Sequence, residues 1–411
     1  MNKKITLDYF LPFYLLLLLG TYAVLLIPNT TGDRDNTIFT IFSSAILIFG
    51  LITTLFLTRK IDKKFLATTS LLTAITIVSQ ATADAQLKSI VYFLVLTSNF
   101  IFAYVISKHI SIEQLFKKLL YTILLLILAS IILYALSFES VKYIDHHQRP
   151  TVIGTDPIRG LFAHKVMASL YAVTGLTLSL YFLKKWKLYI AISVISLFIL
   201  LTGSSTGILL ATLVPLLFLF YKIIFSLKLS KSVFALFLLI LISGIATLLH
   251  NSYEYIFLAL GRDSTLTGRT YLWEWALYAW AEKPIFGWGY LGYFDSPHYH
   301  SFSGRYPSFE NYEVPHFHNS LLQVLVDFGL SGAIILFYMT SKIFSSLYDA
   351  AAQNKGQCIQ FYLIILFTIY IIASMTMHIL FNYNHAVSFL MFYLFCHALN
   401  SKENNPNNRQ L

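Results

Sequence analysis

Charge is scarce in this sequence. Only 12% of its 411 residues are charged, whereas 57% are hydrophobic and 16% are aromatic. A water-soluble chain of this length would need far more charge to cover its surface. The shortage therefore excludes an ordinary soluble globular protein and indicates a chain that lies mostly in lipid.

Cysteine is nearly absent as well. Only two occur, Cys358 and Cys396, and both lie inside apolar stretches. Two thiols in such surroundings exclude a disulfide framework and a thiolate metal site. The H-x-H pairs at 298–300 and 316–318 have no nearby third ligand with conventional spacing, so they are weak candidates for zinc. We therefore expect neither a metal nor another cofactor.

Long apolar runs are what the sequence has instead. Residues 9–27 and 232–249, for example, are each about long enough to cross a bilayer, which takes roughly 20 helical residues. The first run lacks the small-residue cleavage site of a signal peptide. We predict an all-α polytopic membrane protein with about twelve transmembrane helices. The predicted spans are 9–27, 37–58, 65–80, 89–107, 119–138, 166–183, 188–202, 207–226, 232–250, 327–345, 357–377 and 385–400.

Basic residues predict the orientation of these spans. Most connections rich in Lys and Arg, such as those near 3–4, 59–64 and 184–187, fall on one side of the predicted arrangement. The positive-inside rule makes that side cytoplasmic and places both termini there. The formal net charge of +10 then needs no nucleic-acid partner. We expect a multi-pass protein of a bacterial inner membrane, in contact with membrane lipids, whose other face lies in the periplasm.

Two long connections lie on the predicted outer side, at 139–165 and at about 251–318. In the second, the aromatic and aliphatic residues of 267–284 have helical spacing, which predicts an amphipathic helix at the membrane interface. The Gly-rich stretch that follows predicts a turn and then an irregular loop. The predicted organisation is an N-terminal set of helices (1–150), a core with the loop 251–318 (151–345), and C-terminal helices with a polar cytoplasmic tail (346–411).

The outer loops hold the side chains with candidate chemistry. Several arginines and lysines there run against the positive-inside trend, which indicates an anionic ligand on that face. Arg269 stands out because it opens the predicted amphipathic helix, where free amides and the helix dipole also favour an anion. His316, His318 and Asn319 end the loop just before an apolar helix. A neutral histidine can take a proton from a sugar hydroxyl, although plain interfacial histidines fit this position as well.

Several short motifs occur in order along the chain. They are RGLFAHK (159–165), TGSST (202–206), GRDSTLTGRTYLW (261–273), PIFGWGY (284–290), and HFHN (316–319) followed by DFGLSG (327–332). In this order, and inside a polytopic chain, they resemble the O-antigen ligase and polysaccharide polymerase superfamily over residues 158–332. The resemblance implies a membrane glycosyltransferase of the GT-C type, which takes its glycan from an undecaprenyl-diphosphate donor at the periplasmic face without a metal.

The resemblance also implies roles for individual residues. His318 is expected to be the base that activates the acceptor hydroxyl, and Arg269 is expected to hold the donor diphosphate. His316 and Asn319 are expected to line the pocket or orient the base. The chain departs from the family where a cation commonly follows the serine of the S-x-T motif, because Ser205 stands there. The second phosphate contact is then expected from other cations of these motifs, namely Arg159, Lys165 and Arg262.

The motifs leave the acceptor open. A ligase passes the glycan to a lipid A–core sugar, whereas a polymerase passes it to the next lipid-linked repeat unit, as in O-antigen, capsule or exopolysaccharide synthesis. A chain-length regulator is a candidate partner of a polymerase. A transporter of the same lipid-linked oligosaccharide is the alternative from another class. Transporters usually place ionisable groups near the bilayer midplane, but these spans are almost free of charge and show no inverted repeat.

Overall fold

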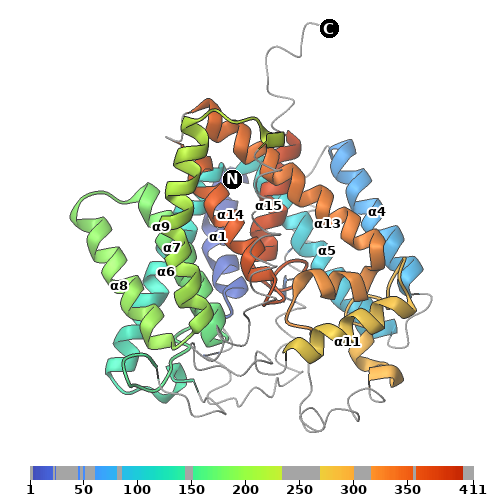
Figure 1. Cartoon of the computed structure of the whole chain (residues 1–411), viewed down its shortest axis with the longest axis horizontal. Coiled ribbons are helices and arrows are strands. Elements are labelled where there is room, and N and C mark those ends of the chain that lie inside the picture. The colour runs from blue at the N-terminus through green and yellow to red at the C-terminus, as the bar shows by residue number, and fades with distance from the viewer. Residues whose placement is uncertain are drawn as a thin grey trace, which may run out of the picture.

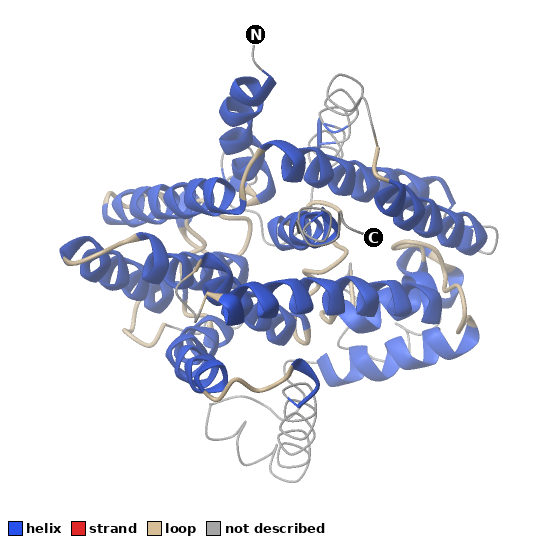
Figure 2. Cartoon of the chain, turned by 90° about the horizontal axis from the view of Figure 1, so that it is seen from above, coloured by secondary structure: helices blue, strands red, loops and turns tan. Residues whose placement is uncertain are grey.

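Helices dominate the part of the chain that the computed structural model describes. That part comprises residues 3–21, 24, 45–46, 50, 61–80, 86–143, 151–233, 269–299, 316–354 and 358–400. Its ribbon is helix and loop throughout, and its one β feature is an isolated bridge between Lys142 and Ile158 (Figure 2). The predicted all-helical class is confirmed for these residues.

The described α-helices have the following bounds: α1 (Lys3–Leu18), α4 (Lys63–Gln80), α5 (Gln86–His109), α6 (Ile112–Ala135), α7 (Lys165–Phe182), α8 (Trp186–Thr202), α9 (Ser205–Ser226), α11 (Arg269–Glu282), α13 (Ser320–Gln353), α14 (Ile359–Ser374) and α15 (Ala386–Asn400). Two short 3-10 turns, η1 (Glu139–Val141) and η2 (Tyr293–Asp295), lie in the long connections.

Five of the described helices are long and apolar enough to cross a membrane, judged by length and composition. They are Ser89–His109, Ile112–Ala135, Lys165–Phe182, Ser205–Ser226 and Ser320–Gln353, and shorter apolar helices accompany them. Large apolar side chains such as Leu125 on α6 and Leu216 on α9 are exposed, as expected of a lipid-facing surface. The chain is thus a helical, multi-pass membrane protein. The predicted spans 37–58 and 232–250 lie almost wholly outside the described residues, so the total of about twelve stays a prediction.

Two helices begin earlier than their predicted spans. Helix α6 starts at Ile112 instead of 119, because a capping box between Ser111 and Gln114 satisfies the first free amides inside a polar connection. Helix α13 starts at Ser320 instead of 327. Polar residues in its first two turns hid this start from the hydropathy pattern, although their side chains are buried.

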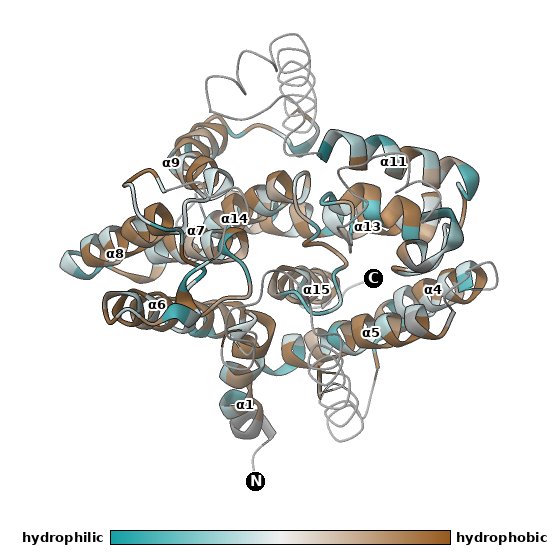
Figure 3. Cartoon of the chain, turned by 90° about the horizontal axis from the view of Figure 1, so that it is seen from below, coloured by the Kyte–Doolittle hydropathy of each residue, from teal (hydrophilic) through white to brown (hydrophobic). Residues whose placement is uncertain are grey.

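Helix α15 occupies the middle of the bundle. Seen end-on, it is ringed by α1, α5, α13, α14 and α7 (Figure 3). Nearly all of its described side chains are buried. The described parts of the long connections, 139–143, 151–164 and 283–299, lie with α11 toward one end of the bundle, the lower end in Figure 1. The candidate motifs therefore converge on one end of a rigid helical scaffold.

Candidate functional site

The HFHN segment enters helix α13 in a fixed conformation. The Asn319 side-chain oxygen caps the helix by accepting bonds from the N–H groups of Leu321 and Leu322, at 3.0 and 3.1 Å. His318 has a φ of +52°, in the left-handed region that few residues other than glycine adopt. Its N–H donates to Nδ1 of His316 at 3.2 Å. Because Nδ1 accepts this bond, a neutral His316 ring carries its proton on Nε2.

Three histidine rings gather at this helix end. The rings of His316 and His318 have centroids 4.3 Å apart and meet edge to face. The ring of His378 lies 5.5 Å from His316 and is buried. The motif analysis missed His378, which belongs to the short connection between α14 and α15. The signal available there is the stretch HILFNYNH (378–385), in which polar residues interrupt two apolar helices.

Most of the non-helical connection 375–385 is buried in the bundle, although Met375 at its start is exposed. Backbone amides and carbonyls in such surroundings need hydrogen-bond partners. Side chains supply many of them. Asn99 donates to Tyr383 O at 3.4 Å, and the Ser388 hydroxyl donates to Ile379 O at 2.8 Å. The connection is therefore an ordered part of the bundle.

The residues that follow His318 tie helix α13 to this connection. The amide of Asn319 donates to the carbonyl of Met375 at 3.0 Å. The Ser320 hydroxyl donates to Met377 O at 2.8 Å and accepts the N–H groups of Ile379 and Leu380 at 2.9 and 3.1 Å. In the described contacts, Asn319 thus acts as a cap and an anchor. It fixes His318 through the backbone.

Tyr290 of the PIFGWGY motif is a third anchor of the connection, and its removal is expected to destabilise the fold. The buried Tyr290 hydroxyl donates to Phe381 O at 2.7 Å and accepts the Tyr383 N–H at 2.9 Å. Tyr290→Phe leaves both backbone groups without this partner, at a cost of about 1–3 kcal/mol. We expect a lower thermal unfolding midpoint in detergent. Tyr278→Phe, at a side chain that is 59% exposed, should leave the midpoint unchanged, and equal effects would contradict the anchor.

Helix α11 lies where the sequence predicts a helix, but it is not amphipathic, because Leu277 and Tyr278 are exposed on the face opposite its buried residues. Its buried residues, Leu272, Trp275, Ala276 and Ala279, form one helical stripe. The Trp275 ring packs 5.9 Å from Phe317, the residue between the two histidines. Arg269 opens this helix about 9 Å along the axis from Trp275, at 1.5 Å per residue. Helix α11, which Arg269 opens, therefore packs against the HFHN segment through Trp275.

The chain just before the RGLFAHK motif is bonded to the end of α8, just before the TGSST turn. The N–H of Ile158 donates to Leu201 O, at the end of α8, at 3.0 Å. Arg159 is 5% exposed, and its Nε donates to Ser140 O at 3.2 Å. Burial lowers the pKa of the Arg159 guanidinium from its ordinary value, but a guanidinium remains cationic at neutral pH. Ser205 is the half-buried first residue of α9, so the missing family cation and Arg159 belong to one region.

His164 is a second residue that the motif analysis passed over. It caps α7, with its Nδ1 accepting the N–H of Val166 at 3.1 Å. Its Nε2 lies 2.9 Å from the hydroxyl of Tyr143, so a neutral ring donates this bond. The ammonium of Lys165 sits over the Tyr143 ring, 4.8 Å from its centroid. Lys165 is half-buried and opens α7, which leaves it better exposed to an anion than Arg159.

The connection 375–385 also reaches the RGLFAHK side of the cluster. At its end, Nε2 of His385 lies 3.2 Å from the Tyr171 hydroxyl and 3.0 Å from the Met167 sulfur, and both partners belong to α7. The HFHN segment and the start of α7 are therefore linked through one buried piece of chain. Arg262 lies outside the described residues. Among those described, no group of three His, Cys, Asp or Glu side chains is arranged to hold a metal ion.

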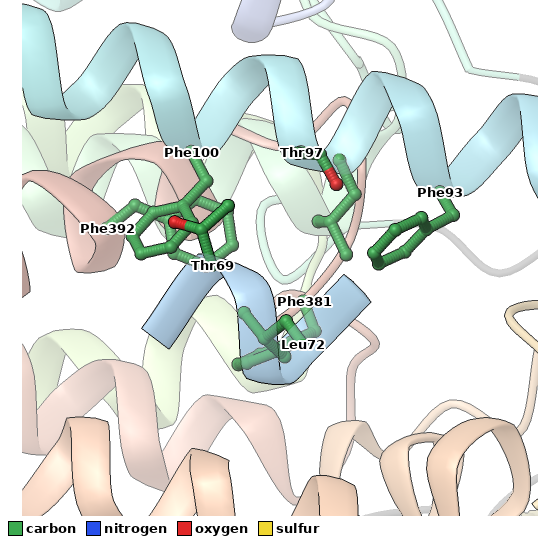
Figure 4. A pocket seen from close by; sticks show the side chains of 8 residues that line it. Thr69, Leu72, Phe93, Thr97, Phe100, Phe381 and Phe392 are labelled. Carbon is green, nitrogen blue, oxygen red and sulfur yellow. The ribbon is translucent and has the colours of Figure 1, made fainter. Parts of the chain in front are cut away.

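A small pocket between α4, α5 and the end of the connection has a different character (Figure 4). Its lining residues are Thr69, Leu72, Phe93, Leu96, Thr97, Phe100, Phe381 and Phe392. None of these side chains is ionisable, so the pocket suits hydrocarbon and does not suit a diphosphate. The candidate site is the polar cluster, and this pocket does not belong to it.

The fold and the cluster define a class: a helical membrane protein with histidine and arginine motifs gathered at one end of its bundle. Comparison with known protein families supports the resemblance that the sequence motifs predict. Residues 188–337 match the family described as O-antigen ligase. A stretch of 100 residues is 34% identical to the exopolysaccharide production protein ExoQ of Rhizobium meliloti (strain 1021). Both matches support the resemblance to the O-antigen ligase and polysaccharide polymerase superfamily that the motifs predict. The aligned stretch covers 23% of this chain and 22% of that relative.

Proposed function

We propose that the protein is a membrane glycosyltransferase that moves a glycan from undecaprenyl diphosphate to a sugar hydroxyl at the periplasmic face of the inner membrane. The observation that carries the proposal is the fixed geometry of HFHN. His318 is half-buried, lies in the left-handed region and is followed directly by a helix cap. A general base must be held in place before the substrate arrives, and this backbone does so.

The proposed reaction uses His318 as the base. The acceptor hydroxyl oxygen forms a bond to the anomeric carbon of the donor glycan, and the bond from that carbon to the diphosphate breaks. The hydroxyl proton passes to the neutral imidazole of His318, and the lipid diphosphate leaves with the bonding electrons. General base catalysis of this kind contributes about 10²–10⁴-fold to the rate.

The cations of the cluster are proposed to hold the departing diphosphate. Arg269 opens α11 and Lys165 opens α7, so each cationic side chain lies at the N-terminus of a helix, where the helix dipole also favours an anion. Arg159, whose Nε donates to Ser140 O, adds a buried positive charge, and Arg262 remains a further candidate. Preorganised cations stabilise the charge that develops as the bond to the diphosphate breaks.

The acceptor is proposed to be a lipid-linked repeat unit, which makes the enzyme a polymerase. The similarity to a protein of exopolysaccharide production favours this choice. A lipid A–core acceptor, which makes the enzyme a ligase, is the other outcome that the following experiment distinguishes. A polymerase also fits a chain-length regulator as its partner.

Arg269→Ala is expected to lower glycan transfer by about 10²–10³-fold, because it removes a preorganised charge from the leaving group. Arg269→Lys should recover part of the activity, since an ammonium keeps the charge but loses the bidentate fork. The measurement is complementation of a deletion strain, followed by gel analysis of surface polysaccharide and of lipid-linked precursors. Lys342→Ala, on the predicted cytoplasmic half of α13, is the matched control.

The pattern in the deletion strain identifies the reaction. Single repeats on the core indicate a polymerase, whereas bare core with long lipid-linked glycan indicates a ligase. Precursor confined to the cytoplasmic leaflet indicates a transporter instead. A wild-type pattern from Arg269→Ala at normal expression contradicts the proposed role of this arginine.

A further inference from the structure

Two buried polar side chains in helix α13 take no direct part in the proposed chemistry. Gln323 is 0% exposed and Asp327 is 1% exposed. They lie one turn apart, so their side chains meet on one face of the helix. Burial of such groups is costly unless each is hydrogen-bonded, and their partners therefore show what they hold in place.

Gln323 connects Asp327 to the HFHN backbone. Its side-chain oxygen accepts the N–H of Phe317 at 3.0 Å. Its amide nitrogen donates to Oδ1 of Asp327, also at 3.0 Å. The Phe317 N–H can only donate, so it faces the Gln323 side-chain oxygen and leaves the Gln323 amide nitrogen to donate to Oδ1 of Asp327.

Asp327 connects this pair to the PIFGWGY turn. Its Oδ1 also accepts the N–H of Leu291 at 3.0 Å, and its backbone carbonyl accepts the N–H of Gly289 at 3.0 Å. The ion pairs recorded among the described residues do not include Asp327. An apolar pair of similar size would often stabilise a buried site equally well, so the polar network is better explained by the conformation that it selects.

We propose that Gln323 and Asp327 are positioning residues that hold His318 in its left-handed conformation. Their hydrogen-bond chain fixes the backbone of Phe317, directly before His318, while the Asn319 cap fixes the backbone directly after it. The base is thus held from both sides. This inference rests on the proposed role of His318, and it adds two residues that touch neither donor nor acceptor.

A charge swap tests the pair. Gln323→Glu places a carboxylate against that of Asp327, which should release Phe317 and lower kcat by about 100-fold, with the donor KM little changed. In the double variant Gln323→Glu with Asp327→Asn, the new amide nitrogen takes the Oδ1 position and donates to the new carboxylate, so the contact with the Phe317 N–H is restored and only the Leu291 N–H loses its acceptor. We expect the double variant to recover to within about 10-fold of wild type. Gln360→Glu, a half-buried position in α14, is the matched control.

A second readout does not depend on glycan transfer. Purified variants in detergent are treated with diethyl pyrocarbonate, and modification of His318 is followed by mass spectrometry. The Gln323→Glu rate should change several-fold, and the double variant should return to the wild-type rate. An unchanged rate in Gln323→Glu, or a double variant no better than the single, overturns the positioning role. A fully active His318→Asn instead overturns the proposed function, whatever the modification rates show.

Discussion

Replacing His318 with asparagine is expected to reduce glycan transfer by about 10²–10⁴-fold while the protein remains folded. Asparagine tolerates the left-handed backbone better than most residues, so it should accept the φ of +52° that His318 adopts. The asparagine amide is not a base at neutral pH. The loss of glycan transfer therefore measures the contribution of proton transfer, because the backbone conformation is kept. The measurement is turnover of a lipid-linked donor by purified protein, with donor affinity determined in parallel.

The control for this substitution is His298→Asn. His298 is exposed, and its Nδ1 lies 3.6 Å from a carboxylate oxygen of Glu282, so it belongs to the outer loop surface. Its replacement should leave turnover within about twofold of wild type, as is usual for surface substitutions. Retention of more than a tenth of wild-type turnover by His318→Asn would show that another group takes the proton.

Gly329→Ala is expected to prevent accumulation of folded protein. Gly329 forms the kink of α13, with φ 64° and ψ −158°, a backbone conformation that suits glycine alone. A Cβ there would lie 2.3 Å from the carbonyl carbon of Ile285 and 2.6 Å from the N of Phe286. Both are backbone atoms, and the same backbone donates and accepts bonds with α13, so neither can move away. We expect a destabilisation above about 4 kcal/mol, seen as loss of protein from the membrane fraction.

Gly154→Ala separates the steric clash from the cost of a positive φ. Gly154 has φ +76°, but nothing lies within 4 Å of the Cβ position. The left-handed conformation alone costs alanine about 1–2 kcal/mol. Folded yield should therefore stay near that of wild type. Similar losses for both variants would mean that close packing of the kink against 284–290 is unimportant.

Local pattern was sufficient to predict much of the scaffold. Helices α7 and α8 begin within two residues of their predicted starts, at 166 and 188. Each contains an unbroken apolar run, which is a direct signal for a membrane-spanning or buried helix. The helix start after HFHN was predicted, but the apolar span of α13 was predicted to begin only at 327, because Gln323 and its polar neighbours lower the hydropathy of the first two turns. In the structure the side chains of Gln323 and Asp327 are hydrogen-bonded to each other inside the protein. A hydropathy scale scores each residue alone, so it cannot predict that two polar residues are buried as a pair.

The candidate site was predictable only where its residues are close in sequence. His316, His318 and Asn319 form one motif, and Arg269 opens one recognisable helix. His378 joins the histidine cluster from a distant connection, and His164 meets Tyr143 across the whole loop 144–163. These contacts between residues far apart in the sequence depend on how the helices pack. The spacing of residues along the chain does not predict them. The roles of all these residues remain proposals.

The buried connection 375–385 has a consequence for the timing of biosynthesis. Its backbone is bonded to side chains from α5, α13, α15 and the 284–290 turn, including Asn319 and Ser320 beside the proposed base. Those bonds cannot form until α14 and α15 have entered the membrane. A nascent chain that has only reached α13 already contains all the motifs quoted above. It still lacks the connection 375–385, whose backbone bonds Asn319 and Ser320 beside His318. The protein should therefore acquire activity late in its synthesis, after the bundle has closed around α15.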